Sequence, residues 1–305
     1  QFLIREELIK FNKIFNTKGS SAILMNVNNG EIISIVSLPD FNLNQRTTID
    51  DINFINRATK GVYELGSVFK TFTLTAALNE NIVEPETEFI DLKKSIKCGS
   101  NIINEYNKKI PSNLTAEQIL IRSGNIGSVR IAQSVGLEKF KIFMENMGLI
   151  HPIKFDIEEV GNPIPFKWGK CKLATASYGH GITTTILQLT KAYSIIANGG
   201  YEVKPTLIKK NAYLIGKKLL NENVSKKVLK ILRKVVKTKE GTASLANVSG
   251  YEVAGKTGTA EKSAIGGYSR KKINTFATIF PSSNPKYSMV VMLDEPNINS
   301  EYIYN

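Results

Sequence analysis

The apolar positions near the two ends of the chain form short runs typical of β-strands, whereas those in the middle recur at helical spacing. Residues 20–27 and 31–36 are rich in β-branched and aliphatic side chains and flank Asn28-Asn29-Gly30. An Asn-Gly pair between apolar runs predicts a hairpin, because both turn residues tolerate a positive φ. The last third of the chain predicts three more strands, at residues 251–257, 274–280 and 287–293.

Between these strands, apolar residues recur every three to four positions, which indicates amphipathic helices. A helix over 67–80 follows Gly66, and a helix over 185–198 stops at Gly199-Gly200. The helix expected over 224–239 combines an apolar stripe with a strongly basic face. Such a helix can lie on a membrane or dock on a core with its charges in water, and we favour docking. Further helices are predicted near the N-terminus and at residues 115–121, 126–135 and 138–147.

This order of elements predicts an α+β fold in which the N-terminal hairpin and the three C-terminal strands build one antiparallel sheet covered by helices. A mostly helical insertion is expected within about residues 80–240. The chain has no low-complexity linker, so a single domain over 1–305 is favoured. It starts inside a predicted helix and stops just after a strand-like run, so we interpret it as a domain truncated at both ends.

The amino-acid composition is consistent with the predicted fold and adds little to it. The 305 residues are 42% hydrophobic and 22% charged, as in ordinary globular proteins. The net charge of +13 would suit nucleic acid or an anionic surface. The Lys and Arg residues are spread along the chain without an aromatic-interleaved basic motif, so we predict a solvated basic surface and no nucleic-acid partner. No apolar run of about eighteen residues predicts a membrane span.

The two cysteines, Cys98 and Cys171, lack the CxxC spacing and paired histidines of a zinc site, so no metal is expected. Two free buried thiols are the plainer interpretation, and one disulfide stays open.

Three short motifs carry the candidate chemistry: Ser67-Val68-Phe69-Lys70, Ser123-Gly124-Asn125 and Lys256-Thr257-Gly258. A serine hydroxyl needs a base, and a lysine three residues later on a helix lies on the same face. Lys70 can act as that base only when neutral, which requires its pKa to fall by roughly three units, or about 4 kcal/mol. Burial and a second cation favour this fall, and Lys256 is the candidate cation.

Ser-x-x-Lys also occurs at Ser269 and Ser283. Ser269 lies in a polar, turn-like stretch, and Pro285 would break a helix at Ser283. The helix expected at Ser67 therefore selects it as the nucleophile.

The other two motifs suit peptide binding. The Ser123 hydroxyl suits a proton relay to the leaving amine, and the Asn125 amide suits a peptide backbone. Lys256-Thr257-Gly258-Thr259 ends a strand-like run, whose edge can pair with an extended peptide. Its cation and hydroxyls suit a C-terminal carboxylate, and Gly258 permits close approach. The backbone N–H groups of Ser67 and Thr259 would form the oxyanion hole.

This motif set is the one known from penicillin-binding proteins and class A β-lactamases. The chain resembles the class B penicillin-binding proteins of the septal, cell-division type, over roughly residues 18–296. The middle motif has Gly124 where serine is commoner in that family. The segments that carry the resemblance are 56–58, 63–70, 123–127, 178–182, 188–189, 255–262, 280–281 and 292–296.

The resemblance implies a penicillin-binding fold, no cofactor and a D-Ala-D-Ala transpeptidase. Ser67 would be acylated by one stem peptide and the acyl group passed to an amine on another. It further implies inhibition by β-lactams, septal cell-wall synthesis and a place at the periplasmic face of the bacterial inner membrane. The anchor would lie outside this chain, and the partners would be divisome membrane proteins, including a glycosyltransferase.

Three other functions fit parts of the sequence. Residues 250–257 formally match the phosphate-binding G-x-x-x-x-G-K-[ST] loop, but the strand before it and the helix after it are poor. Glu158 and Asn162 resemble the deacylation loop of a β-lactamase or a β-lactam sensor, and a catalytically silent binding module is the third option. His151 and His180 have no obvious carboxylate partner, so we expect structural roles for both.

Overall fold

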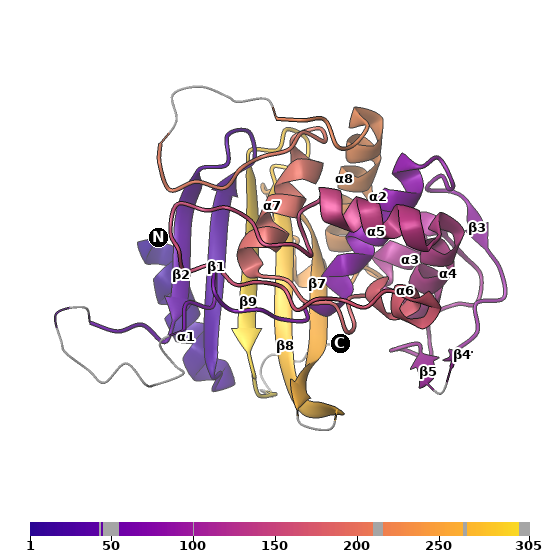
Figure 1. Ribbon diagram of the computed structural model, residues 1–305, viewed down its shortest axis with the longest axis horizontal. Coiled ribbons are helices and arrows are strands. Elements are labelled where there is room, and N and C mark those ends of the chain that lie inside the picture. Colours follow the sequence, from indigo (N-terminus) through magenta and orange to yellow (C-terminus); the bar gives the residue numbers. More distant parts are fainter. Residues whose placement is uncertain (43, 45–54, 100, 210–215, 265–266, 299–305) are drawn as a thin grey trace.

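A five-stranded antiparallel sheet forms the centre of the fold, as the sequence predicts (Figure 1). The computed structural model describes residues 1–42, 44, 55–99, 101–209, 216–264 and 267–298. Because the sheet order is β2-β1-β9-β8-β7, the N-terminal hairpin lies beside the last strand of the chain and β7 lies at the opposite edge. The strands are β1 (Gly19–Asn26), β2 (Ile32–Leu38), β7 (Ala254–Ala264), β8 (Gly267–Phe280) and β9 (Tyr287–Asp294).

The β1–β2 hairpin is confirmed, but its turn differs from the expected one. Of the Asn-Gly pair, only Gly30 has a positive φ, at 79°. The side chain of Asn29 instead accepts a hydrogen bond from the backbone N–H of Glu31 at 3.0 Å. The turn is therefore held by an asparagine side chain rather than by two residues in the left-handed region.

The alternating side chains of β1 separate two hydrophobic layers. Ala22 packs with Leu8 of helix α1 (Phe2–Phe15) on one face of the sheet. Ile23 and Met25 point to the other face, into the main core. Helix α7 (Ile186–Ala197) packs there against β1, β8 and β9. The period of two along the strand thus puts one helix on each face.

The remaining helices gather beside the β7 edge (Figure 1). Two small two-stranded sheets accompany them, β3 with β6 and β4 with β5. The sequence predicts most of these helices within two residues or so, but it misses the small strands and α6. The elements are η2 (Gly66–Val68), α2 (Phe69–Asn79), β3 (Glu88–Phe89), β4 (Ser95–Cys98), β5 (Asn101–Asn104), β6 (Leu114–Thr115), α3 (Ala116–Ile121), α4 (Asn125–Val135), α5 (Leu137–Asn146), α6 (Lys170–Ala176), α8 (Glu222–Lys237) and η3 (Ser244–Ala246).

The helices α2 and α7 are buried on more sides than the apolar face predicted for α2 and the amphipathic pattern predicted for α7 indicate. All residues of α7, and all of α2 from Phe69 to Leu78, are buried, because neighbouring elements cover every side of both helices. Helix α8 does dock on the core as expected. Its apolar stripe packs against β7, α3 and α2. Part of its basic face forms ion pairs, for example Lys234 with Glu117 at 2.7 Å.

The strand β7 begins and ends later than the sequence predicts. Lys256 lies near its start, and the strand continues to Ala264, so Lys256-Thr257-Gly258-Thr259 does not end the run. Ser269, assigned to a turn-like stretch, lies in β8. Pairing with β8 explains both differences, because ladder hydrogen bonds hold polar residues in strands regardless of local propensity.

Within the described part of the chain, no helix has the length and apolarity needed to cross a bilayer.

Candidate active site

The first two motifs meet at the side chain of Lys70. Its Nζ donates to Asn125 Oδ1 at 2.7 Å, to the Ser123 carbonyl at 2.5 Å and to Ser123 Oγ at 3.2 Å. Ser123 has a φ of 58°, a backbone conformation that residues other than glycine rarely adopt. This backbone conformation turns the chain just before α4, so that carbonyl, hydroxyl and amide all face one amine.

Ser67 lies on the single turn η2 that leads into α2, one helical turn before Lys70. Ser67 is half-buried, whereas Lys70 is buried, with an exposed fraction of 1%. The expected helix is therefore present, with the serine at its accessible start and the lysine inside.

The third motif packs directly on the turn before Ser67. Gly66 has a φ of 61°, and a Cβ placed there would lie 2.3 Å from the carbonyl oxygen of Thr259. A Cβ at Gly258 would lie 2.2 Å from the carbonyl oxygen of Leu65. Only glycine permits this contact, which places the backbones of η2 and β7 against each other. Ser67 and Thr259, the two expected oxyanion donors, belong to these touching segments.

Lys256 is completely buried beside this contact. Its Nζ donates to the Thr257 carbonyl at 3.0 Å and to Thr242 Oγ1 at 3.3 Å. Thr257 Oγ1 also donates to Thr242 Oγ1, at 2.8 Å. Thr242 comes from the loop after α8 and carries no sequence motif, so sequence reasoning did not find it.

The two lysines share one electrostatic environment. Burial lowers the pKa of Lys70 to about 7, against the opposing effect of the Glu105 carboxylate. Burial and the charge of Lys70 hold the pKa of Lys256 well below its ordinary value. The pKa of Lys70 is lowered as expected, and burial is the cause. The repulsion between the two amines lowers the pKa of Lys256 instead. Lys70 therefore holds a substantial neutral fraction near pH 7.

Glu105 is a site residue that the sequence analysis missed. Its carboxylate accepts from the backbone N–H of Asn125 at 2.7 Å and of Ile126 at 3.2 Å, at the start of α4. Asn125 Nδ2 donates to the Asn104 carbonyl at 2.9 Å. A carboxylate at a helix N-terminus satisfies amides that lack a partner within the helix. No local signal could have revealed Glu105, because it reaches across twenty residues.

The histidines have carboxylate neighbours, contrary to expectation. His151 Nε2 lies 3.4 Å from Glu145 Oε1, and the His151 carbonyl accepts from Gln188. His180 Nδ1 lies 3.8 Å from Glu64 Oε2. Neither contact includes Ser67 or Lys70, so the structure contains no Ser-His pair among these residues.

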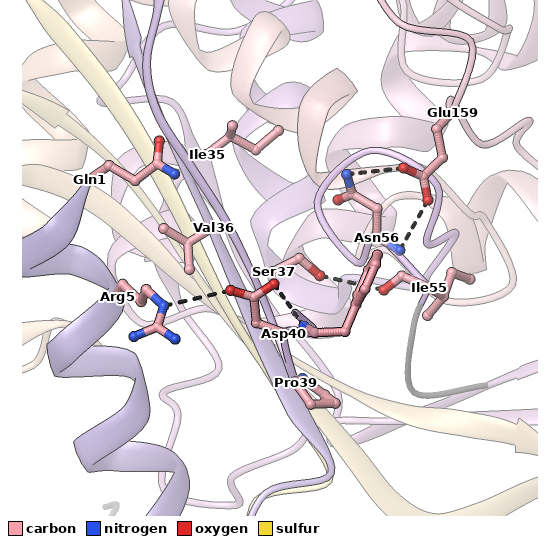
Figure 2. Close-up of a pocket in the computed structure, with 11 residues that line it drawn as sticks. Gln1, Arg5, Ile35, Val36, Ser37, Pro39, Asp40, Ile55, Asn56 and Glu159 are labelled. Carbon is pink, nitrogen blue, oxygen red and sulfur yellow. Dashed lines mark hydrogen bonds and ion pairs between the residues drawn. The ribbon is translucent and has the colours of Figure 1, made fainter. Parts of the chain in front are cut away.

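The loop that contains Glu158 and resembles a deacylation loop contacts Asn56, which lies outside the three motifs. Glu158 is exposed, and the Glu159 carboxylate accepts from the backbone and side-chain N–H groups of Asn56 at 3.3 and 3.4 Å. Glu159 lines a cavity of about 270 Å³ together with Arg5 and Asp40 (Figure 2). This cavity contains none of the motif residues. The phosphate-loop alternative also fails, because Lys256 is followed by strand rather than helix.

Cys98 and Cys171 form a disulfide between the end of β4 and α6, so the free-thiol interpretation is wrong. Both residues are half-buried rather than buried. The bridge ties α6 to the β4–β5 hairpin, and Glu105 follows directly after that hairpin.

A half-buried serine, a buried lysine one turn later and a second buried lysine on the edge strand define the serine class of penicillin-recognising folds. The chain matches the family model described as penicillin binding protein transpeptidase domain over residues 20–304. It belongs to this family of transpeptidase domains.

Comparisons with individual proteins support this family assignment. The chain is 34% identical, over 98% of its length, to the probable peptidoglycan D,D-transpeptidase FtsI of Caulobacter vibrioides, and covers 52% of that protein. It is 29% identical, over 97% of its length, to stage V sporulation protein D of Bacillus subtilis, and covers 48% of it. The chain spans about half the length of these curated relatives.

Among solved structures, the transpeptidase domain of Burkholderia pseudomallei penicillin-binding protein 3 superposes with a TM-score of 0.87 at 28% identity. The match covers 97% of this chain and 86% of that chain.

Proposed function

We propose that this chain is the catalytic domain of a peptidoglycan D,D-transpeptidase, a serine acyltransferase whose nucleophile is Ser67. The single observation that carries the proposal is the position of Lys70, buried one turn after Ser67 and hydrogen-bonded to Ser123 and Asn125. Its pKa of about 7 supports a neutral amine that can accept the hydroxyl proton.

In the proposed acylation, Ser67 Oγ attacks the carbonyl carbon of the penultimate D-Ala while Lys70 takes its proton. The backbone N–H groups of Ser67 and Thr259 receive the developing oxyanion, where one such donor is typically worth about 10²–10³ in rate. The ester bond to Ser67 forms, the terminal peptide bond breaks, and D-Ala leaves with a proton relayed by Ser123 or Lys256.

Substrate binding is assigned to the edge strand and the middle motif. β7 ends the sheet order, which supports pairing with an extended peptide at Gly258. Lys256, Thr257 and Thr259 would hold the terminal carboxylate, and the Asn125 amide would hold the peptide backbone. β-Lactams would acylate the same serine, because they present a strained amide to the same groups.

We further propose septal cell-wall synthesis as the role of the whole protein, with the chain as one transpeptidase domain. The names of several similar proteins support this role, although relatives with a sporulation name share the same domain. The Cys98–Cys171 disulfide supports an oxidising compartment such as the periplasm. The proposed partners are peptidoglycan stem peptides and divisome membrane proteins, including a glycosyltransferase.

Mass spectrometry after incubation of the full-length protein with a β-lactam tests the nucleophile. We expect a covalent adduct on the peptide that contains Ser67, lost in Ser67→Ala and retained in Ser269→Ala. Ser269 is a matched control because it heads another Ser-x-x-Lys sequence. An adduct on a different residue, or none from the folded protein, would contradict the proposal. An adduct that hydrolyses within seconds would indicate a β-lactamase instead.

A further inference from the structure

Four side chains form a second cluster directly before Ser67, and we call Glu64, Tyr178, His180 and Tyr268 the Glu64 cluster. The Glu64 carboxylate accepts from the hydroxyl of Tyr268 at 2.9 Å and from the backbone N–H of Gly181 at 2.7 Å. His180 Nδ1 lies 3.8 Å from the same carboxylate. None of these side chains belongs to the three motifs, and the proposed acylation does not use them.

The Glu64 cluster places a carboxylate beneath exposed aromatic rings. The Glu64 side chain is only 13% exposed, whereas that of His180 is 43% exposed and Tyr268 is 42% exposed. The His180 ring lies 4.6 Å from that of Tyr268 and 6.0 Å from that of Tyr178, centroid to centroid. The phenols stay protonated at neutral pH, because burial and the Glu64 charge raise the pKa of Tyr178 to about 12 and raise that of Tyr268 further.

The cluster also lies close to the nucleophile. Glu64 precedes Ser67 by three residues, so their Cα atoms are at most about 11 Å apart. The 178–181 loop packs on the same turn: a Cβ at Gly179 would lie 2.1 Å from the carbonyl oxygen of Gly66. Gly66 thus contacts Thr259 of β7 and also the loop that carries Tyr178 and His180.

We propose that the Glu64 cluster binds the ammonium group of the amine that attacks the acyl-enzyme. The proposal rests on the proposed transpeptidase function and names where its acceptor substrate binds. A carboxylate fixed by a phenol and bordered by aromatic faces is the chemistry that attracts a primary ammonium. The third motif, Lys256 with its threonines, is assigned to the donor carboxylate, so the donor carboxylate and the acceptor amine bind to different segments around Ser67.

The step that follows balances as an aminolysis. The acceptor ammonium first releases one proton, and its nitrogen then forms an amide bond to the acyl carbon. The ester bond to Ser67 Oγ breaks, the attacking nitrogen loses a second proton, and Ser67 regains one. The overall reaction converts an ammonium and an ester into an amide and an alcohol and releases one proton.

The test measures how the acyl-enzyme is partitioned between amine and water. The full-length protein receives an N-acyl-D-alanyl thioester donor that contains no amino group, with D-alaninamide as the cationic acceptor. The ratio of aminolysis to hydrolysis product is measured by mass spectrometry. We expect Glu64→Gln to lower this ratio about tenfold or more, since hydrogen bonds to charged groups are worth roughly 1.5–3 kcal/mol. Tyr268→Phe should lower it less, because the carboxylate remains.

Two controls separate binding of the cation from general damage. Both products form from the same acyl-enzyme, so their ratio depends neither on how fast the acyl-enzyme forms nor on how much of it there is. A variant that folds in lower yield therefore gives the same ratio. Hydroxylamine, an uncharged nucleophile at neutral pH, should retain its ratio in Glu64→Gln. Glu88→Gln, which removes an exposed carboxylate from strand β3, should retain both ratios.

An unaltered ratio with D-alaninamide in Glu64→Gln, while Ser67 is still labelled by penicillin, would overturn the acceptor site and leave the proposed function intact. Equal losses with both nucleophiles would also overturn it. Slower acylation by a donor that bears an amine, with normal partitioning, would assign the cluster to the donor stem and contradict the proposal. Absence of penicillin labelling on Ser67 in the unaltered protein would instead defeat the proposed function itself.

Discussion

The Nζ atom of Lys70 donates a hydrogen bond to Oδ1 of Asn125 at 2.7 Å, although the two residues are 55 positions apart. This amine donates its hydrogen bonds to neutral oxygen atoms of Ser123 and Asn125. The Glu105 carboxylate raises the pKa of Lys70 through its charge. Its hydrogen bond, however, is with the backbone N–H of Asn125 and not with the Lys70 amine. A buried lysine held by neutral acceptors loses its proton more readily than one in an ion pair.

Acylation should therefore gain rate as the pH rises through about 7. The pKa of Lys70 is lowered to about 7, so the neutral amine predominates above that pH and the ammonium below it. The rate of penicillin labelling of Ser67, measured from pH 5 to 9, should show an ascending limb centred near pH 7. Lys70→Arg should label at a rate lower by about 10²–10⁴, because a guanidinium stays protonated. A pH-independent rate in the unaltered protein would show that Lys70 is not the titrating base.

Glu105→Gln should move the ascending limb to lower pH. The Glu105 carboxylate raises the pKa of Lys70, so its removal leaves the effect of burial unopposed and lowers that pKa further. Tyr106 is a further titratable neighbour, and its ring lies 5.7 Å from the Lys70 amine. Glutamine keeps one of the two carboxylate oxygens, so one of the amides of Asn125 and Ile126 retains its acceptor at the start of α4.

Labelling rates of Glu105→Gln and of the exposed control Glu88→Gln over the same pH range check this prediction. The control should follow the unaltered protein. A midpoint of Glu105→Gln that stays in place or rises would contradict the assigned electrostatic role.

Gly179→Ala should impair both stability and acylation, and Gly136→Ala only stability. Both glycines have φ values above 80°, so alanine is strained at either position. Such strain costs about 1–3 kcal/mol. A Cβ at Gly136 meets nothing within 4 Å, whereas one at Gly179 meets the Gly66 backbone. We expect Gly179→Ala to lose roughly 1–3 kcal/mol more and to slow the labelling of Ser67.

Denaturant unfolding and labelling rates of the two variants provide the comparison. Equal labelling rates in Gly179→Ala and Gly136→Ala would show that the 178–181 loop does not position the nucleophile turn.

Reduction of the Cys98–Cys171 disulfide should destabilise the fold by about 4 kcal/mol. The bond closes a loop of 73 residues, and cross-linking a loop of that length restricts the unfolded chain by roughly this amount. Urea unfolding with and without a phosphine reductant measures the difference. A variant with both cysteines replaced by serine should be insensitive to the reductant. Equal stability of the unaltered protein under both conditions would contradict the prediction.

Local chemistry was enough to predict much of the fold. The apolar runs at the two ends, with turn residues between them, predicted the five strands, because side-chain alternation is a property of the strand itself. Helix starts were also local: Thr115 and Thr185 each form a capping box with a glutamine three residues later. The apolar helical pattern after Ser67, together with Pro285 near Ser283 and the polar stretch around Ser269, predicted which serine heads a helix.

Only the tertiary structure decided what surrounds that serine. Glu105, Thr242 and Glu64 lie outside the three motifs. Each contacts a distant segment: Glu105 the start of α4, Thr242 the Lys256 amine of β7, and Glu64 the Tyr268 hydroxyl of β8. The full burial of α2 and α7 and the Cys98–Cys171 pairing are likewise set by packing. Sequence patterns record contacts within a few residues of each other, whereas pKa values and long-range hydrogen bonds depend on which distant segments exclude water together.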